Sequence, residues 1–382
     1  MGPATEQHIP YGRQVIDDDD VAAVVEVLRG DWLTTGPAVE RFERAFADLV
    51  GAEHAVAVTN GTAALHLAML AAGIGPGDEV IVPSLTFAAS ANAVRLAGAD
   101  VVFADVRPDT LGISVDHAVS LVGPRTRAIV TVDYAGIPSD FDELVELAER
   151  HGLVIIDDAC HAVGATYRGR PVGSIAHLST FSFHPVKHPT TAEGGMVTTA
   201  DPALAGRVRR LRNHGIDTDF RTREQRGTWE YDVVELGLNY RLPDLNCALG
   251  ASQVAKVPGW VERRRAIAAR YVERLAGLPL QVLTHPEDRE PSWHLFPVLV
   301  DPGAVVDRDG LVARLREEGI GANVHYRPVH LHTLYAADAR HQGTLPVAED
   351  AGRRVLTLPL WHGMTDGEQD RVIDTLTRIL RP

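Results

Sequence analysis

The chain contains very little lysine. Of its 382 residues, 37 are lysine or arginine, and only Lys187 and Lys256 are lysines. The guanidinium of arginine stays protonated above about pH 12, whereas an amine can lose its proton and attack a carbonyl. A lysine that is retained in such an arginine-biased chain is therefore a candidate for chemistry that arginine cannot perform.

Three further shortages exclude classes of protein. Cys160 and Cys247 are the only cysteines and lie far apart, so they predict neither a disulfide framework nor a zinc site. The net charge of −14 argues against broad binding of nucleic acid or anionic membranes, because both need a basic face. No apolar run approaches the roughly 18 residues of a membrane span, and no signal-like segment begins the chain. We expect a cytoplasmic protein that binds neither nucleic acid nor membrane.

The length and the pattern of hydrophobic residues predict an α/β protein of two domains. From His54 onward, short β-rich runs alternate with helical runs, which favours crossover connections and a mostly parallel central sheet with helices on both faces. We place a large domain at residues 1–257, with an N-terminal helical segment, and a smaller C-terminal α/β domain at residues 258–382. The strands expected in the large domain are Ala55–Val58, Glu79–Val82, Asp100–Asp105, Ala128–Asp133, Leu153–Asp158, Ser179–Phe183 and Met196–Thr199.

Three expectations concern local structure later in the chain. Asp217–Gly227 is charged and turn-like, which indicates a loop. Pro258-Gly259 marks a break between two helical patterns. In the small domain, Ala322–Tyr326 reads as a strand.

One candidate anion site follows the first predicted strand. Thr59-Asn60-Gly61-Thr62-Ala63 leads from that strand into a helix, and Gly61 lets the backbone approach a ligand closely. The free N–H groups of Thr62 and Ala63 would then point at an anion. An ordinary strand-to-helix turn capped by Thr62 is the alternative.

The run Leu153-Val-Ile-Ile-Asp-Asp-Ala-Cys-His161 is a buried strand that ends in two acids. Alternation along a strand places Asp157 and Asp158 on opposite faces, so only one of them can face a given site. A carboxylate at a strand end can keep a pyridinium nitrogen protonated, Cys160 is small enough to pack against a flat ring, and His161 can donate a hydrogen bond to a phenolate. The alternatives are caps on the following turn or a metal site, but these three side chains make poor simultaneous metal ligands, and we expect no metal.

Lys187 follows the apolar run Leu178–Phe183 and lies between prolines, ahead of Gly194-Gly195. Burial at this place would lower its pKa and favour the neutral, nucleophilic amine. A surface lysine without a special role remains the alternative at this point.

These residues belong to an ordered set of motifs that resembles the DegT/DnrJ/EryC1/StrS sugar aminotransferases. The resemblance covers roughly residues 10–380. It implies the fold-type I architecture of transferases that depend on pyridoxal 5'-phosphate. The motifs that carry it are Gly61-Thr62-Ala63, Gly77-Asp78-Glu79-Val80, Pro83-Ser-Leu-Thr-Phe87, Asp158-Ala-Cys-His-Ala-Val-Gly164, Ser182-Phe-His-Pro-Val-Lys187, Glu193-Gly-Gly195, Leu211-Arg-Asn-His-Gly215, Gly237-Leu-Asn-Tyr-Arg241, Val324-His-Tyr-Arg-Pro328 and Leu358-Pro359.

The resemblance implies a role for each matching residue. Lys187 would hold the cofactor as a Schiff base and move a proton during transamination, while Asp158 would pair with the pyridine nitrogen. Around the ring, His161 would approach the ring oxygen, and Phe87 and Cys160 would pack on its two faces. Gly61, Thr62, Ala63 and Ser182 would hold the phosphate, and Asn239 would reach it from a second subunit, which makes a homodimer the minimal active unit.

The resemblance also implies the reaction. The expected activity is transfer of an amino group, usually from L-glutamate in this family, to a nucleotide-linked keto-sugar. Phe183-His184-Pro185-Val186 resembles the branch that acts on UDP-4-keto-6-deoxy-N-acetylhexosamines. Asp133, which stands where many members have histidine, and Pro189 and Ala192 depart from the pattern. The expected substrate contacts, each of which could instead be a packing residue, are Trp32, Arg241, His325 and Tyr326.

Three other functions compete with this one. The first is amination of a keto-cyclitol in aminoglycoside-type biosynthesis by the same mechanism. The second is a cofactor-dependent dehydratase of the same family, but such members replace the lysine with histidine, and Lys187 argues against it. The third is a non-catalytic regulatory homologue, which the joint presence of Lys187, Asp158, Ser182 and Asn239 disfavours.

Overall fold

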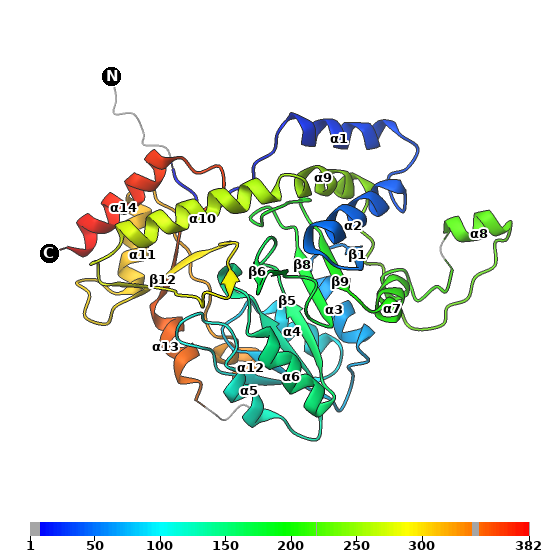
Figure 1. The fold of residues 1–382 in the computed structure, drawn as a ribbon, viewed down its shortest axis with the longest axis horizontal. Helices are drawn as coiled ribbons and strands as arrows, with labels where there is room; N and C mark the ends of the chain where they lie inside the picture. Colours follow the sequence, from blue (N-terminus) through cyan, green and yellow to red (C-terminus); the bar gives the residue numbers. More distant parts are fainter. Residues whose placement is uncertain (1–7, 219, 338–343, 382) are drawn as a thin grey trace.

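The computed structural model describes residues 8–218, 220–337 and 344–381. A seven-stranded sheet forms the centre of the molecule, with helices around it, and a smaller three-stranded sheet lies beside it (Figure 1). The strands are β1 His54–Val58, β2 Glu79–Pro83, β3 Asp100–Ala104, β4 Thr126–Val132, β5 Val154–Asp158, β6 Thr166–Tyr167, β7 Arg170–Pro171, β8 Leu178–Ser182, β9 Gly195–Thr199, β10 Leu280–Val282, β11 Arg289–Glu290, β12 Phe296–Val300 and β13 Val355–Leu358.

The helices follow the alternation that the sequence predicts. The long α10 runs beside the small sheet, and α8 stands away from the body of the molecule (Figure 1). The helices are α1 Asp18–Arg29, α2 Pro37–Val50, α3 Gly61–Ala71, α4 Ala89–Leu96, α5 Val115–Leu121, α6 Phe141–His151, α7 Pro202–Arg212, α8 Phe220–Arg226, α9 Asp244–Val254, α10 Val257–Arg274, α11 Arg308–Glu317, α12 Thr333–Ala336, α13 Pro346–Arg354 and α14 Asp366–Leu380, with short 3₁₀ turns η1 Tyr134–Gly136 and η2 Val329–Leu331.

The large sheet has the strand order β1-β9-β8-β5-β4-β2-β3. The pairs from β8 to β3 are all parallel, whereas β9 runs antiparallel to both of its neighbours, β1 and β8. The prediction of a mostly parallel sheet is therefore confirmed. Because the carboxyl ends of parallel strands lie at one edge, that edge is where a ligand site is expected.

Both faces of this sheet are covered, as the continuous apolar strands predict. On β2, Val80 and Val82 pack into one buried cluster, whereas Ile81 between them packs into the other. On β4, Val130 and Ile129 divide between the two clusters in the same way. The core therefore forms two layers, one on each side of the sheet, and holds the strand ends rigidly.

The second sheet, β10-β12-β13, is antiparallel throughout. The division after residue 257 stays a prediction, and two β-pairings among the described residues cross it. Strand β11 pairs with β6 of the large part, and Ile9 forms an isolated parallel bridge with Ile320. The two parts are therefore tied together at points far apart in the sequence.

The N-terminal segment links both parts of the chain. Ile9, which is 2% exposed, exchanges backbone hydrogen bonds with Gly319 and Gly321, and Leu360 N donates to Tyr11 O at 3.0 Å. Farther along, Gln253 Nε2 donates to Val15 O at 3.1 Å. The segment that the sequence presents as a polar tail thus crosses from the small sheet to α9.

Lys256, the second lysine, has a structural role. Its amine lies 2.6 Å from Asp17 and 2.8 Å from the buried Asp20. Asp20 also accepts hydrogen bonds from Ser252 and Gln253, so the start of α1 is fixed to the end of α9. This pairing leaves Lys187 as the only lysine with no ion pair among the described residues.

The structure differs from three local predictions. Phe220–Arg226 is a helix, α8, where we expected a loop, and its sequence has no glycine or proline before Gly227. Residue 219, which belongs to the predicted loop, lies outside the described residues. Pro258 and Gly259 lie in the first turn of α10 rather than in a break, because proline is tolerated where no intrahelical N–H bond is made. Ala322–Tyr326 forms a single bridge at Asn323 instead of a strand.

Candidate active site

A cavity of about 790 Å³ opens at the carboxyl ends of β5 and β8. Its wall also includes the start of α3, the turn before α4 and the segment 323–326 of the small part. All but three of the residues predicted from the sequence line it. They are Gly61, Thr62, Ala63, Phe87, Asp158, Cys160, His161, Ser182, Lys187, His325 and Tyr326.

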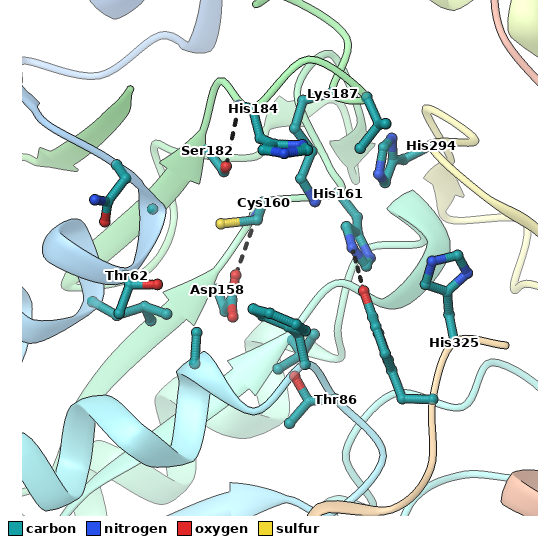
Figure 2. Close-up of a pocket in the computed structure, with 18 of the residues that line it drawn as sticks. Thr62, Thr86, Asp158, Cys160, His161, Ser182, His184, Lys187, His294 and His325 are labelled. Carbon is teal, nitrogen blue, oxygen red and sulfur yellow. Dashed lines mark hydrogen bonds between the residues drawn. The ribbon is translucent and has the colours of Figure 1, made fainter. Parts of the chain in front are cut away.

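The side chains of Lys187, Asp158 and His161 converge on this cavity, with Thr62 and Ser182 toward one end and His294 and His325 toward the other (Figure 2). Lys187 follows a turn in which its own N–H donates to His184 O at 2.8 Å. Burial lowers the pKa of Lys187, and the nearby Cys160 and Asp158 oppose this effect. The amine is therefore easier to deprotonate than a surface lysine.

Asp158 ends β5 and is 6% exposed. Ser90 Oγ of α4 donates to one carboxylate oxygen at 2.7 Å, and the N–H of Cys160 donates to the other at 3.3 Å. Asp157 points to the opposite face, where Ser179 Oγ donates to it at 3.1 Å. The predicted division of the two acids between the two faces is confirmed.

The start of α3 has the features of an anion site, with one change from expectation. Asn60, not Thr62, caps the helix: its side chain accepts from Ala63 N at 2.8 Å. The N–H of Ala63 is therefore engaged rather than free, which corrects the expectation of two free donors. The N–H of Thr62 still lies in the unpaired first turn and points outward from a helix N-terminus.

Gly61 keeps this end of the cavity open. A Cβ atom on Gly61 would lie 2.8 Å from Ser182 Cβ and 3.3 Å from Cys160 Sγ. Any larger residue would therefore fill the space between α3 and the end of β8. The site is a cradle formed by backbone and small side chains.

His161 lies at the opposite side of Asp158 from α3. Its Nε2 shares a hydrogen bond with the Tyr326 hydroxyl at 3.3 Å, and its Nδ1 has no hydrogen-bond partner among the described residues. Burial, together with the charge of Lys187, holds the pKa of His161 well below its usual value. A neutral imidazole can donate to an oxygen of a bound ring.

Three predicted residues lie outside the cavity of this chain. Asn239 is exposed, and Arg241 donates to Asn213 Oδ1 at 2.7 Å. Trp32 lies in the loop between α1 and α2. The structure therefore brings together the expected cofactor residues except Asn239, and two of the four expected substrate contacts.

Other cavity residues were not predicted from the sequence. The interaction of Ser90 with Asp158 spans 68 positions, and no local pattern indicates it. Asn60 is the exception, since an asparagine before a glycine at a helix start is a recognisable cap. The further lining residues are Tyr11, Asn60, Leu65, Thr86, Ala89, Val132, His184, Val186, Glu193, Tyr240, His294, Leu295, Asn323 and Val324.

Asp133 lies fully buried behind the site. Ser139 donates to it twice, from N at 2.7 Å and from Oγ at 2.8 Å, while its Oδ2 has no hydrogen-bond partner among the described residues. Burial raises the pKa of Asp133 to about 7; the bonds from Ser139 and the charge of Arg289 oppose the rise, and the charge of Asp158 adds to it. Burial also raises the pKa of Asp157.

No group of three histidine, cysteine, aspartate or glutamate side chains within the described ranges is placed to hold a metal ion. In the same part of the chain, no helix is both long and apolar enough to cross a membrane.

The architecture and the site can now be compared with known proteins. The sequence pattern of the DegT/DnrJ/EryC1/StrS aminotransferase family matches residues 14–377. The chain belongs to this family of aminotransferases that depend on pyridoxal phosphate.

Solved structures agree over nearly the whole chain. Spr1654 from Streptococcus pneumoniae, a proposed sugar aminotransferase in its PMP form, is 34% identical with a TM-score of 0.92, over 97% of this chain and 98% of that one. PseC from Helicobacter pylori, an aminotransferase involved in the biosynthesis of pseudoaminic acid, is 30% identical with a TM-score of 0.91, over 98% and 99%. The sugar aminotransferase CalS13 from Micromonospora echinospora is 31% identical with a TM-score of 0.88, over 97% and 99%.

The residues of the cavity fit pyridoxal phosphate. The cradle at Gly61 suits a phosphate, Asp158 suits a protonated ring nitrogen, and the unpartnered Nδ1 of His161 suits a polar ring substituent. The single amine in the cavity, that of Lys187, suits an aldehyde.

We expect Asp133→Asn to alter how stability depends on pH. A carboxyl whose pKa is higher in the folded state binds more protons there than when unfolded, so it costs stability as pH rises from about 4 to 7. The asparagine keeps an oxygen for Ser139 but cannot ionise. At pH 8 the free energy of unfolding of the variant should exceed that of the native protein by up to about 4 kcal/mol. At pH 4 the two values should be nearly equal.

Denaturant unfolding at several pH values measures this effect. Asp116→Asn, the same change at an exposed position on α5, provides the control and should leave the pH profile unchanged. A profile for Asp133→Asn that follows the native one would show that Asp133 does not titrate differently on folding.

Proposed function

We propose that the protein transfers the amino group of an amino acid, L-glutamate, to the keto group of a nucleotide-linked 4-keto-6-deoxy sugar. The observation that carries the proposal is the position of Lys187, the only lysine in the cavity, together with the buried carboxylate of Asp158. Membership in the family and the cofactor supply the reaction class. The sugar acceptor is supported by relatives such as CalS13, described as a sugar aminotransferase.

Each residue has a role that its position supports. Lys187 would bind the aldehyde carbon of the cofactor, and Asp158 would hold a proton on the ring nitrogen. Gly61, Thr62 and Ser182 would bind the phosphate at the start of α3. The Thr62 N–H and the Ser182 hydroxyl supply donors there, and the helix N-terminus favours a negative charge.

Around the ring, three side chains would fix its position. Phe87 and Cys160 line the cavity and would pack against the two ring faces, while His161 would donate to the ring oxygen. Phe87 lies 5.9 Å from Tyr326, measured between ring centres, so an aromatic wall continues from the ring toward the small part.

The bound cofactor withdraws electrons from the α-carbon of an attached amine, so that its α-proton becomes acidic. Lys187, whose amine is easier to deprotonate because of burial, accepts that proton and returns it to a neighbouring carbon. Asp158 would lie opposite the ring nitrogen and stabilise the positive charge there, while Ser90 holds the carboxylate in place. The same residues act in reverse on the ketone.

The identity of the acceptor rests on the residues before Lys187. His184 and Val186, from the Phe183-His184-Pro185-Val186 run, both line the cavity. This supports the branch that acts on UDP-4-keto-6-deoxy-N-acetylhexosamines, and the similarity to PseC, an aminotransferase involved in pseudoaminic acid biosynthesis, supports a sugar as the acceptor. Tyr326 and His325 also line the cavity and are the substrate contacts that the geometry favours.

We also propose that the active form is a homodimer. Asn239 lies outside its own cavity and is exposed, as expected of a residue that serves a second copy. The segment before it carries large apolar side chains at the surface, including Trp229 at 83% and Leu236 at 90% exposed. Such a patch supports an interface. We also propose that the protein is located in the cytoplasm. Both of its cysteines are free, which is consistent with a reducing compartment.

The first test concerns Lys187. Borohydride reduction, which fixes an imine, should place the cofactor tag on Lys187 by mass spectrometry. Lys187→Ala should carry no tag, and its turnover should fall by about 10²–10⁴-fold because the acid–base group is lost. Lys256→Ala is the matched control and should keep both the tag and the turnover, since Lys256 pairs with Asp17 and Asp20. A tag on Lys256, or turnover by Lys187→Ala, would overturn the assignment.

The second test concerns the acceptor. With glutamate as donor, a UDP-4-keto-6-deoxy-N-acetylhexosamine should react with a kcat/KM about 100-fold above that of a keto-inositol, because contacts to the nucleotide add binding energy in the transition state. The reverse order would support the keto-cyclitol reaction instead. Reaction with neither ketone, despite loss of the glutamate amino group, would exclude both acceptors.

The third test concerns the dimer. Lys187→Ala and Asn239→Asp should each be inactive alone, but a mixture refolded together should regain about a quarter of native activity. Half of randomly formed dimers are then mixed, and each mixed dimer has one site with both native residues. Two separately refolded proteins, combined afterward without exchange, are the control. A mixture as inactive as its components would contradict a shared site.

A further inference from the structure

Four imidazoles and one guanidinium lie together behind Lys187, and we call them the histidine cluster. His161, His188, His294 and Arg264 are buried, whereas His362 is partly exposed. The rings of His161 and His294 lie 4.7 Å apart between centres, and those of His188 and His294 lie 5.6 Å apart. Two members, His161 and His294, line the cavity, and Figure 2 shows both beside Lys187.

Arg264 of α10 extends the cluster away from the cavity. It is 1% exposed and has no carboxylate within ion-pair distance among the residues that the structure describes. Its Nη1 instead donates to three carbonyls, those of Trp293, His294 and Leu360, each at 3.2 Å. His362 follows Leu360 by two positions and stacks on Trp260, with ring centres 4.3 Å apart, at a partly exposed place.

The rings of the cluster are neutral at pH 7. Burial holds the pKa values of His188 and His294 well below the usual value, and the charges of Arg264 and Lys187 act in the same direction. Burial, again with Arg264, lowers the pKa of His362 to about 4. A neutral imidazole has one donor and one acceptor nitrogen, so each ring can both give and take a hydrogen bond.

The cluster holds most of the unsatisfied polar atoms in the described part of the protein. Within that part, ten buried side-chain nitrogen or oxygen atoms have no hydrogen-bond partner, and six of them belong to the cluster. An unpaired buried polar atom is costly, and native proteins rarely leave one without a partner. The six atoms are His161 Nδ1, His188 Nε2, His294 Nδ1, His362 Nδ1, His362 Nε2 and Arg264 Nε.

The chemistry of these atoms selects their ligand. The cluster contains both hydrogen-bond donors and acceptors, and among the described residues no carboxylate pairs with it and no set of three side chains is placed for a metal. The one cation of the cluster, Arg264, already donates from Nη1 to carbonyl oxygens. These oxygens carry partial negative charge and would repel an anion, so an anionic ligand is disfavoured. Water, which donates and accepts equally, satisfies such a set.

We propose that the histidine cluster holds a file of ordered water molecules that connects the cavity beside Lys187 with the surface at His362, and that this file exchanges water and protons with the site during turnover. The exchange of water and protons during turnover rests on the proposed function. Transfer of the amino group from the donor consumes one water, whose oxygen becomes the keto oxygen of the donor product. Transfer to the ketone releases one water that carries the oxygen of that ketone.

A path behind the site has a physical reason. A nucleotide sugar bound in this cavity of about 790 Å³ would narrow its mouth and limit exchange with bulk water. The water released when the ketone condenses must nevertheless leave while the acceptor sugar is still bound. The cluster begins at the inner wall, at His161 and His294, so it provides a route that the substrate does not block.

The direct test is a high-resolution crystal structure of the resting native enzyme. We expect ordered waters within about 2.7–3.2 Å of at least three of the five atoms other than His161 Nδ1, which the cofactor's ring oxygen would occupy, with each water within hydrogen-bond distance of the next. A dry cluster, or side chains that rotate to pair with one another, would overturn the proposal. This measurement does not depend on enzymatic activity. If the protein lacked aminotransferase activity but the waters were present, the proposed function would be wrong and the file of waters would still be confirmed.

Two variants of His362 test the role in turnover. His362→Phe keeps a ring to stack on Trp260 but removes both ring nitrogens, and it should lower kcat at least threefold, leave KM unchanged and remove the outer waters from the crystal structure. His362→Gln keeps a donor and an acceptor and should stay near the native rate. His151→Phe, at the exposed end of α6, is the control for the change itself and should match the native enzyme.

The contrast between the two variants decides the role. An equal decrease of kcat in His362→Phe and His362→Gln would show that His362 only supports the fold. An unchanged kcat in His362→Phe would exclude water exchange through this route. If His362→Phe does not fold, the native crystal structure still decides whether the file of waters exists.

Discussion

The structure depends on keeping one amine and one carboxylate close together inside one cavity. Asp158 and the residues before Lys187 come from neighbouring parallel strands, since Asp158 of β5 is paired with Thr180 of β8. The rigid sheet therefore fixes the separation of the two groups more firmly than any loop could. The remaining site residues complete this arrangement: Ser90 fixes the carboxylate, and the start of α3 closes one end.

Charge is distributed around this pair in an uneven way. Three buried aspartates, Asp133, Asp157 and Asp158, lie on the sheet side of the site. Burial, with a smaller contribution from the neighbouring carboxylates, raises the pKa values of Asp133 and Asp157. On the other side, burial lowers the pKa of His294, and the charges of Lys187 and Arg264 act in the same direction. A cofactor with a cationic ring nitrogen and an anionic phosphate fits between these two regions.

Much of this arrangement could be predicted from the sequence. The strands of the large sheet and the opposite directions of Asp157 and Asp158 follow from local periodicity, and the ordered motifs indicate the cofactor residues. Contacts between distant segments could not be predicted this way: Ser90 on Asp158, and His294 beside His161, depend on how the helices and the small part pack. The helix at Phe220–Arg226 was missed because its charged sequence has no apolar stripe that would distinguish it from a loop. The capping role of Asn60, by contrast, follows from a recognisable local pattern, an asparagine at the start of a helix.

The N-terminal segment has a consequence for how the protein is handled in the laboratory. Tyr11 belongs to the cavity wall, and the backbone around it is bonded both to the small sheet and, at Val15, to α9. A shortened gene that starts at α1 would look harmless in an alignment of core elements, yet it would remove part of the substrate chamber and one of the ties between the two parts. Purification tags are better attached at the end of α14, which is far from the cavity in the sequence and carries none of its lining residues.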